Sequence, residues 1–350
     1  MKRFDADTLH DTLTTLFTRA GATPEVADST ARILVEGDLL GHHTHGVKLA
    51  RGYLKDMQDG HATGDHTRLE IHDKGSIAAL FDGHYILGPW LMERALARCR
   101  DSTRHAGLGI VTIRRAHHIA CLAAYLQPLV EANLVPVIMS SDPANASVAP
   151  FGGLTPVYSP NPLAIGIPGR HQPMLIDVSM STLANGTVAR ARRNGERLPY
   201  PAILDAEGRT SDDPEDYFRP PGGSILPLGE LAFGHKGFAL GLAIEALTSA
   251  LGGYGRKDTP TGAGASVTVM VIDPARFGGA ASFLDETDHL TRRCLNAGER
   301  EAGRPVRLPG QAGLARRRDY LENGIPLPED ALETLQAAIA DASLTTRLPL

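Results

Sequence analysis

Histidines stand at two places in this 350-residue chain where proton transfer is chemically reasonable. His117 and His118 follow an apolar run, and His45 stands between a threonine and a glycine. An imidazole titrates near neutral pH and can both donate and accept a proton. The carboxyl end of a strand is also where active sites of α/β proteins form. Taken alone, a histidine pair at a helix start is more commonly a capping or packing feature, so both interpretations stay open here.

His42, His43 and His45 lie within four positions and raise the question of a metal ion. No carboxylate or further histidine follows them at HExxH-type spacing. We therefore expect no metal site, and structural or solvent-facing roles for His42 and His43. A metal-dependent hydrolase or lyase that combines these three histidines with His118 is the alternative function.

The glycine patterns exclude several common nucleotide-binding sites. Gly107-Leu108-Gly109 lacks the third glycine of GxGxxG, and no GxxxxGK[ST] loop is present. The chain also has no Gly-x-Ser-x-Gly nucleophile elbow. Spacing alone thus gives no support to a Rossmann dehydrogenase, a phosphate-loop NTPase or a serine hydrolase.

Helical and strand patterns alternate along the chain and would position these histidines. Apolar residues at helical spacing predict helices over 9–17 and 24–40, a short one through Tyr53, and others after Gly88, Gly234 and residue 330. Apolar runs predict a strand pair over 68–82 and strands over 109–113, 134–139, 174–179 and 267–272. A helix is expected over 118–131, and a mobile or surface excursion over 190–227. This order is typical of an α/β protein with a site at its strand ends.

Composition excludes several other classes of partner. A net charge of −5 and 5% aromatic residues give no indication of nucleic-acid binding. The three cysteines form no CxxC pair, and no run approaches the roughly 20 apolar residues that span a bilayer. Residues 1–7 lack the apolar core of a signal peptide. We therefore expect a soluble cytoplasmic protein with no membrane partner.

Short motifs in a fixed order resemble the type-2 malate/L-lactate dehydrogenase family, which includes ureidoglycolate and sulfolactate dehydrogenase-like oxidoreductases. The resemblance spans nearly the whole chain. It rests on Thr44-His45-Gly46-Val47 with Tyr53, His118-x-Ala120 with Tyr125 (the family pattern is His-x-Gly), Ser141-Asp142-Pro143, Pro150-Phe151-Gly152-Gly153, Asn161-Pro162-Leu163-Ala164, Asp177-Val178-Ser179, Pro227-Leu228-Gly229, His235-Lys236-Gly237-Phe238 with Glu245, and Val306-Arg307-Leu308-Pro309-Gly310 before Gly324-Ile325.

The resemblance implies an α/β, non-Rossmann, sulfolactate-dehydrogenase-like fold. A helical N-terminal part would pack with C-terminal segments (1–70 with 232–350) around a central coenzyme-binding domain (71–231). It also implies a homodimer that uses NAD or NADP to interconvert 2-hydroxy and 2-oxo acids, or to reduce cyclic imino acids. A non-catalytic binding protein of the same fold is a further alternative.

The resemblance also assigns roles to individual residues. The catalytic residues would be His118 as general acid/base, with His45 and Thr44 beside it. Tyr53 and Lys48 would lie on the substrate side. The coenzyme contacts would come from Ser141, Asp177, Val178, Ser179 and Lys236.

Departures from the family pattern fall on the substrate side. Leu49 stands where the family commonly has an arginine for the substrate carboxylate, and Pro160, Met180 and Thr187 replace other usual residues. Most of these changes make the pocket less polar or less cationic. We therefore expect a substrate other than malate or lactate, bulkier or more apolar, whose carboxylate is bound by another cation.

Overall fold

The computed structural model describes residues 2–73, 75 and 77–342, and the chain divides into two compact units. The first unit comprises 1–138, 164–177 and 269–350, and the second comprises 139–163 and 178–268. The division by function that we predict, with coenzyme binding assigned to 71–231, stays a prediction.

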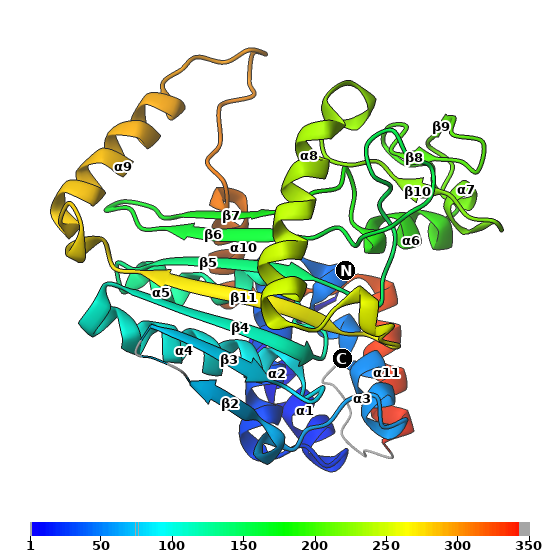
Figure 1. Ribbon diagram of the computed structural model, residues 1–350, viewed down its shortest axis with the longest axis horizontal. Helices are drawn as coiled ribbons and strands as arrows, with labels where there is room; N and C mark the ends of the chain where they lie inside the picture. Colours follow the sequence, from blue (N-terminus) through cyan, green and yellow to red (C-terminus); the bar gives the residue numbers. More distant parts are fainter. Residues whose placement is uncertain (1, 74, 76, 343–350) are drawn as a thin grey trace. The chain divides into compact units, whose positions relative to one another are not determined.

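A mixed sheet lies mainly in the first unit, with the ends of β5, β6, β7 and β11 belonging to the second (Figure 1). Strand β3 pairs with β2 in antiparallel fashion and with β4 in parallel. This agrees with the predicted strand pair over 68–82 and the α/β class. The order across the sheet is β2 (Glu70–Asp73), β3 (Ala78–Asp82), β4 (Leu108–Ala116), β11 (Ala265–Ile272), β5 (Val135–Ser141), β6 (Leu163–Ile167) and β7 (Met174–Val178).

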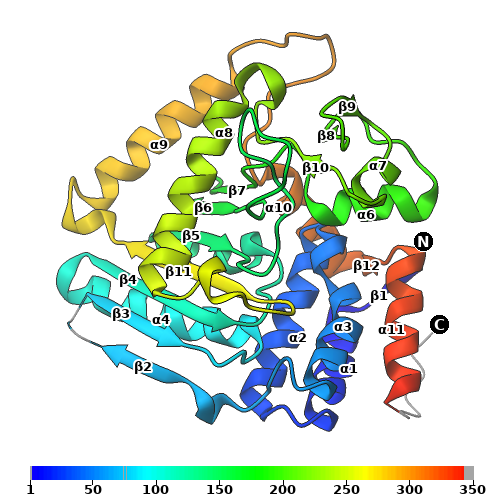
Figure 2. The ribbon, with the colours of Figure 1, turned by 45° about the vertical axis from the view of Figure 1, so that its right-hand side comes forward.

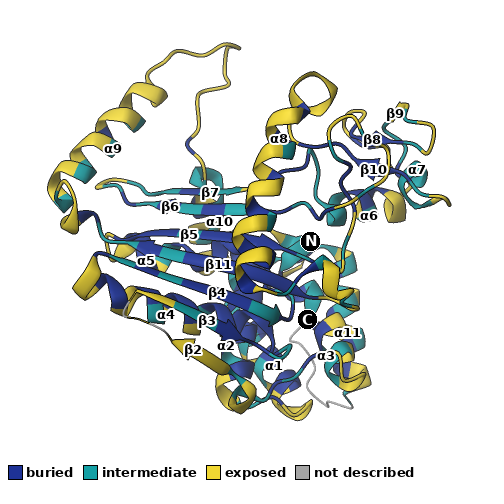
Figure 3. Ribbon diagram, in the orientation of Figure 1, coloured by how far each residue is buried: buried dark blue, intermediate teal, exposed yellow. Residues whose placement is uncertain are grey.

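Helix α4 (Gly88–Ala106) covers β4 with an apolar face. Its residues Leu91, Met92, Ala95 and Cys99 are fully buried, as the i, i+3, i+4 spacing of that face predicts. Figure 3 shows the inner strands β4, β5 and β11 as largely buried, whereas the edge strand β2 is exposed. Burial of these side chains fixes β4, and with it the segment that carries His118.

The N-terminal helices form as the sequence predicts. Helix α1 (Ala6–Arg19) begins at Asp5, whose carboxylate accepts the Thr8 backbone N–H at 2.9 Å. Helix α2 (Pro24–Leu39) begins with a proline, which has no N–H to satisfy at that position. Figure 2 shows both helices beside α3 (Ala50–Gln58) and α11 (Glu329–Asp341), and α3 and α11 are in contact.

The remaining elements of the first unit are short or peripheral. Two-residue strands β1 (Arg3–Phe4) and β12 (Ile325–Pro326) pair with each other in antiparallel fashion. The other elements are the helices α5 (Gln127–Glu131), α9 (Ala280–Leu295) and α10 (Gln311–Asn323), and the 3₁₀ turns His43–His45, Val47–Leu49, His66–Arg68, Leu122–Tyr125 and Pro274–Arg276.

The second unit is built on helix α8 (Glu230–Glu245), which continues as a π-helical turn over Ala246–Ala250. A second layer contains the helices α6 (Asn185–Asn194) and α7 (Glu215–Phe218), and the strands β8 (Ile203–Leu204), β9 (Thr210–Ser211) and β10 (Ser224–Ile225). A 3₁₀ turn covers Arg256–Asp258.

Two details of the sequence prediction are wrong. The expected helix over 118–131 starts only at Leu122, because Ala120 has a left-handed φ of 57°, which a helix does not contain. Residues of the excursion over 190–227, such as Ile203 and Ile225, are buried in a core that also contains Val188. In α8 and its π-helical continuation, Ile244 is buried, whereas Leu240, Leu247 and Leu251 are 45–53% exposed.

No helix within the described residues has the length and apolar character needed to cross a membrane.

Candidate active site

His118 lies immediately beyond the end of β4, where the chain runs past the start of α4. Gly88 permits this close approach: a Cβ there would lie 2.5 Å from the backbone oxygens of both His117 and His118. Any side chain at Gly88 would therefore displace the histidine segment. The position of His118 thus depends on a glycine that the sequence analysis treated only as the start of a helix.

The imidazole of His118 is held by Tyr53 of α3. The Tyr53 hydroxyl lies 2.6 Å from His118 Nδ1 and donates to the His118 carbonyl oxygen at 3.1 Å. When the phenol proton is donated to that carbonyl oxygen, the phenol oxygen accepts a hydrogen bond from Nδ1–H. In this tautomer of His118 the Nε2 lone pair is free. A longer contact, 3.3 Å from the Ala120 N–H to Nδ1, corresponds to the other tautomer. Burial raises the pKa of the Tyr53 phenol well above its usual value, so the hydroxyl stays protonated.

His117 packs against Tyr53 and is itself paired with Asp56. The buried His117 ring meets the Tyr53 ring edge-on at 4.7 Å, and its Nε2 lies 3.0 Å from Asp56 Oδ2. The hydrogen bond from His117 lowers the pKa of Asp56. The sequence analysis missed Asp56, although its place three residues after Tyr53 on a helix puts both side chains on one face.

His45 stacks on His118, with ring centroids 5.8 Å apart and planes inclined by 22°. The Thr44 hydroxyl lies 2.9 Å from His45 Nδ1, as the predicted pairing of these residues requires. Removal from water lowers the pKa of His118 to about 3, with His45 and His117 adding to the shift and Asp56 opposing it. Burial likewise lowers the pKa of His45 to about 4. Both rings are therefore neutral at pH 7, and His118 is available as a base.

Asp38 shapes the turn that carries His45. Its buried carboxylate accepts the Val47 backbone N–H at 2.7 Å and lies 2.7 Å from His43 Nδ1. A Cβ at Gly46 would lie 2.2 Å from Asp38 Oδ2, so only glycine fits between the carboxylate and the turn. This gives His43 the structural role that the sequence predicts. Asp38 itself was missed, because its link to the motif is visible only in three dimensions.

The cations nearest in sequence to Leu49 are both ion-paired. The Lys48 ammonium is bound to Asp330 of α11, and Arg51 Nε lies 3.1 Å from Asp341. A substrate carboxylate would have to compete with Asp330 for Lys48. The substrate contacts predicted for Lys48 and Tyr53 stay predictions, and the Tyr53 hydroxyl is already engaged with His118.

Four of the residues predicted to contact the coenzyme belong to the second unit. The Ser141 hydroxyl is buried between Thr248 and Ser249, with oxygen–oxygen distances of 2.8 and 2.9 Å. Ser179 donates to the Ser181 carbonyl oxygen at 2.9 Å. Val178 and Lys236 are exposed, and the Lys236 ammonium lies 5.0 Å from the centre of the Phe233 ring. Their roles in coenzyme binding stay predictions.

The Asn161 and Glu245 motifs of the resemblance meet inside the second unit. Asn161 Nδ2 donates to the Gly241 carbonyl oxygen at 2.9 Å and to Glu245 Oε1 at 3.2 Å. Arg256 binds the same Glu245 oxygen at 2.6 Å and donates to the Asp142 carbonyl oxygen at 3.0 Å. Burial raises the pKa of the Asp142 side chain to about 6, against the opposing effect of Arg256. The motifs thus brace α8 against the loop that follows β5.

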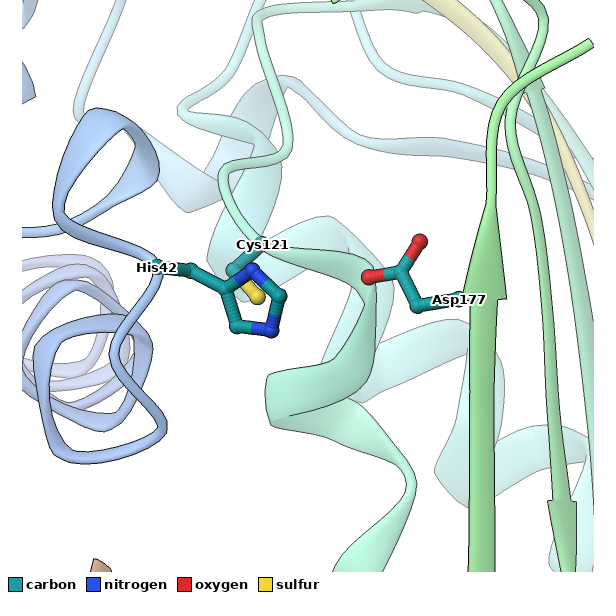
Figure 4. A group of neighbouring side chains, drawn as sticks. All are labelled: His42, Cys121 and Asp177. Atoms are coloured by element: carbon teal, nitrogen blue, oxygen red, sulfur yellow. The ribbon is translucent and has the colours of Figure 1, made fainter. Parts of the chain in front are cut away.

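Within the described part of the chain, two groups of side chains have the donor atoms for a metal ion. One is His42, Cys121 and Asp177, drawn in Figure 4, and the other is Glu70, Asp82 and His84. The alternative set of His42, His43, His45 and His118 does not form such a group in the same residues. The metal-dependent hydrolase that would use those four imidazoles therefore loses its geometric basis.

A cavity of about 750 Å³ in the first unit lies apart from these histidines. It is lined by residues of α1, α3 and α11, among them Leu16, Arg51 and Ala338. His45 and His118 are not among the residues that line it.

Comparison with known proteins places these features in a family. The model of the malate/L-lactate dehydrogenase family matches residues 4–336. The L-sulfolactate dehydrogenase of Methanothermobacter thermautotrophicus is 31% identical over 329 residues, which cover 91% of each chain. The (2R)-3-sulfolactate dehydrogenase (NADP⁺) of Chromohalobacter salexigens is 32% identical over 321 residues, covering 89% of this chain and 90% of its own.

Solved structures agree with the expected non-Rossmann α/β fold. The Δ1-piperideine-2-carboxylate reductase of Pseudomonas syringae superimposes with a TM-score of 0.84 at 28% identity, covering 97% of this chain and 100% of its own. The sulfolactate dehydrogenase of Methanocaldococcus jannaschii has a TM-score of 0.85 at 23% identity, with 98% of both chains covered, and supports the fold alone. The chain therefore belongs to the malate/L-lactate dehydrogenase family and is an oxidoreductase with the fold of the sulfolactate dehydrogenases.

Proposed function

We propose that this protein transfers a hydride between NAD(P) and a 2-hydroxy or 2-oxo acid, or a cyclic imino acid, with His118 as general acid/base. The observation that carries the proposal is the 2.6 Å contact between the Tyr53 hydroxyl and His118 Nδ1. A positioned imidazole whose second nitrogen is free is what removal of a hydroxyl proton requires.

The nicotinamide, when bound, supplies or accepts the hydride. In the oxidation direction His118 Nε2 takes the substrate hydroxyl proton, while Nδ1–H stays on the Tyr53 oxygen. The imidazolium that results keeps the same partner, so the ring need not turn between the two states. In reduction the same nitrogen returns the proton to the oxygen or nitrogen of the substrate. His45, oriented by Thr44, is the second polar group beside the reacting atoms.

We assign the coenzyme to Ser141, Asp177, Val178, Ser179 and Lys236. This assignment comes from their match to the family motifs and from the chemistry of lysine, whose ammonium can bind a pyrophosphate. Lys236 is exposed on α8 and free to meet such a ligand. The Ser141 hydroxyl is already hydrogen-bonded inside the protein. Lys236 and the Asp177 segment are therefore the main coenzyme contacts that we propose.

The substrate is proposed to differ from malate and lactate. Leu49 offers no charge where the family commonly has an arginine, and Lys48 and Arg51 are bound to aspartates. A bulkier or more apolar acid suits such surroundings, with its carboxylate bound by a cation outside this segment. Efficient turnover of malate or lactate, measured as kcat/KM, would contradict this part of the proposal.

The exposed apolar face of α8 and its π-helical continuation supports the homodimer that we propose. Leu240, Leu247 and Leu251 are 45–53% exposed, in a stripe that an amphipathic helix normally buries. We propose that a second copy of the chain covers this stripe. Leu247→Asp would then convert a dimer into a monomer in analytical ultracentrifugation, and an unchanged mass would exclude the stripe as the interface. Cytoplasmic location stays a prediction.

The direct test is a panel of 2-oxo acids and cyclic imino acids, followed by oxidation of NADH and of NADPH. We expect turnover of at least one substrate class and a clear preference for one coenzyme. Absence of both turnover and coenzyme binding would favour the non-catalytic alternative. Coenzyme binding without turnover on the panel would instead require a wider choice of substrate.

A further inference from the structure

Three side chains from distant parts of the sequence converge in the first unit. His42 follows α2, Cys121 lies three residues after His118, and Asp177 lies near the end of β7. Their ligand atoms all lie within 4.8 Å of one another. In Figure 4 the His42 ring and the Asp177 carboxylate face each other, with the Cys121 sulfur beside the ring. None of the three is needed in the proton transfer proposed for His118, although Asp177 is also among the residues that we assign to the coenzyme.

Backbone contacts fix two of the three positions. The Ala123 N–H donates to Asp177 Oδ2 at 3.0 Å, which ties the end of β7 to the segment that carries Cys121. Oδ1 has no hydrogen-bond donor among the residues that the structure describes. Cys121 is buried, with 3% of its surface exposed, whereas His42 is exposed to solvent. The group therefore combines a buried thiol and a carboxylate held by a backbone N–H with an exposed imidazole.

The donor set favours zinc-like ions over magnesium or calcium. Sulfur, imidazole nitrogen and carboxylate oxygen are the ligands of zinc, whereas magnesium and calcium prefer oxygen alone. A thiolate and a carboxylate together would neutralise a doubly charged ion. Metal–ligand bonds of about 2.0–2.3 Å place ligand atoms roughly 3.5 Å apart. Because the ligand atoms lie within 4.8 Å of one another, they would draw together by up to about 1.3 Å to bind an ion.

The second group with metal-binding donor atoms provides an internal comparison. In Glu70, Asp82 and His84, the buried Asp82 carboxylate is already bound by Arg114 at 2.7 Å and Arg115 at 2.5 Å. Two guanidinium groups would repel an incoming cation. The group of His42, Cys121 and Asp177 contains no such ion pair within the described residues. Arg316 acts on the His42 imidazole, where its charge adds to the lowering of the pKa by burial, but it is not among the groups that shift the pKa of Asp177. The two groups are therefore predicted to behave differently.

We propose that His42, Cys121 and Asp177 form a binding site for a divalent ion of the zinc class, with a fourth coordination position left open. This differs from our expectation, based on sequence alone, that the protein has no metal site. The inference goes beyond the proposed dehydrogenase activity, and its test does not require that activity.

The test is a titration of the full-length, metal-free protein with Co²⁺, which replaces Zn²⁺ and reports its ligands by absorption. We expect one equivalent to bind with a thiolate-to-cobalt charge-transfer band, and Zn²⁺ to displace it. Cys121→Ser should abolish the band, and His42→Ala should weaken binding roughly 100-fold, because a lost ligand costs at least as much as a lost outer contact. Cys294→Ser, which removes an exposed cysteine outside the group, should leave both unchanged.

The outcomes separate the proposal from a nonspecific site. Stoichiometric Co²⁺ binding without a thiolate band, or a band that survives Cys121→Ser, would overturn it. Absence of tight binding to the wild-type protein would do the same. His42 is exposed, so His42→Ala is expected to fold normally and keeps the test valid if Cys121→Ser proves unstable. Equal Co²⁺ affinity of His42→Ala and wild type would also contradict the proposal.

Discussion

The histidine cluster of the first unit and the proposed coenzyme residues of the second differ in how completely each is organised. In the first unit, His118 has its hydrogen-bond partner, its stacking neighbour and its backbone position in place. In the second unit, the Ser141 hydroxyl is bonded to other hydroxyl groups, and the Lys236 ammonium extends from an exposed helix. The proposed proton-transfer group is therefore held by contacts within the folded chain, whereas the Lys236 ammonium proposed for the coenzyme is exposed.

This difference has a physical basis. An acid/base group contributes to catalysis only if its reacting nitrogen is held in one direction, so its supporting contacts belong to the folded chain. A phosphate-binding lysine gains most from a flexible stem and a single charge, which need little advance organisation. Substitutions in the two regions should therefore affect different kinetic constants.

Loss of the His118 imidazole is predicted to have the largest effect. His118→Ala should lower kcat by about two to four orders of magnitude, the usual contribution of a positioned acid/base. Coenzyme affinity should stay nearly unchanged, because the proposed coenzyme contacts come from other residues. Steady-state kinetics and coenzyme titration by fluorescence measure the two quantities separately. If His118→Ala weakened coenzyme affinity by a factor similar to its loss of kcat, the two regions would not have separate roles.

Loss of the Lys236 ammonium should produce the reverse pattern. Lys236→Ala should raise the coenzyme Kd by roughly 10- to 100-fold, the value of a charge-assisted hydrogen bond of about 1.5–3 kcal/mol. With saturating coenzyme, kcat should change much less. Lys257→Ala, on a 3₁₀ turn of the same unit, is a matched control for loss of one positive charge. Equal effects of the two lysine variants would show that net charge, and not a specific contact, affects binding.

Removal of the Tyr53 hydroxyl should have a smaller effect that appears in the pH profile. With the pKa of His118 lowered to about 3, the neutral base predominates above that pH, so kcat/KM for oxidation should be flat from about pH 5 upward and fall at lower pH. Tyr53→Phe leaves Nδ1–H without its acceptor, which disfavours the imidazolium and moves the acid limb to lower pH. We expect kcat to fall about tenfold, in line with one lost hydrogen bond to a charged group. An altered KM with an unchanged kcat and profile would favour the substrate-side role predicted for Tyr53.

The sequence predicted helices and strands better than it predicted contacts between residues that are far apart in the chain. Leu9, Leu13, Leu16 and Phe17 are all buried on α1, because the spacing of a helix face is local information. Asp56 was also within reach, since it lies one helical turn after Tyr53. In contrast, His42, Cys121 and Asp177 are separated by more than fifty residues at each step, and no pattern in one sequence reports such a contact.

Backbone conformation was the other source of error. The apolar residues after His118 suit a helix, but the positive φ of Ala120 leaves the preceding residues irregular. The resemblance already contained the signal, because the family pattern has glycine where this chain has Ala120. A glycine in a motif commonly marks a left-handed backbone position. At this position the glycine of the family pattern was a better guide to the backbone than the helical spacing of a few apolar residues.

The strain at Ala120 leads to the smallest predicted effect. A non-glycine residue in the left-handed region costs about 1–2 kcal/mol of stability, and a glycine there avoids that cost. Part of the benefit is lost, because glycine has more conformational freedom in the unfolded chain. Ala120→Gly should therefore raise the free energy of unfolding by about 1 kcal/mol. Ala124→Gly, in the 3₁₀ turn that follows and without a positive φ, should lower it instead. Chemical denaturation of both variants measures this difference.

The same pair of variants tests how rigid the His118 segment must be. The Ala120 N–H lies 3.3 Å from His118 Nδ1, so a change in the backbone at this position acts close to the imidazole. If Tyr53 alone positions the ring, Ala120→Gly should gain stability and keep its kcat. A more stable variant with a lower kcat would mean that the strained alanine helps to hold His118, and that the organisation of the first unit extends from side chains to the backbone.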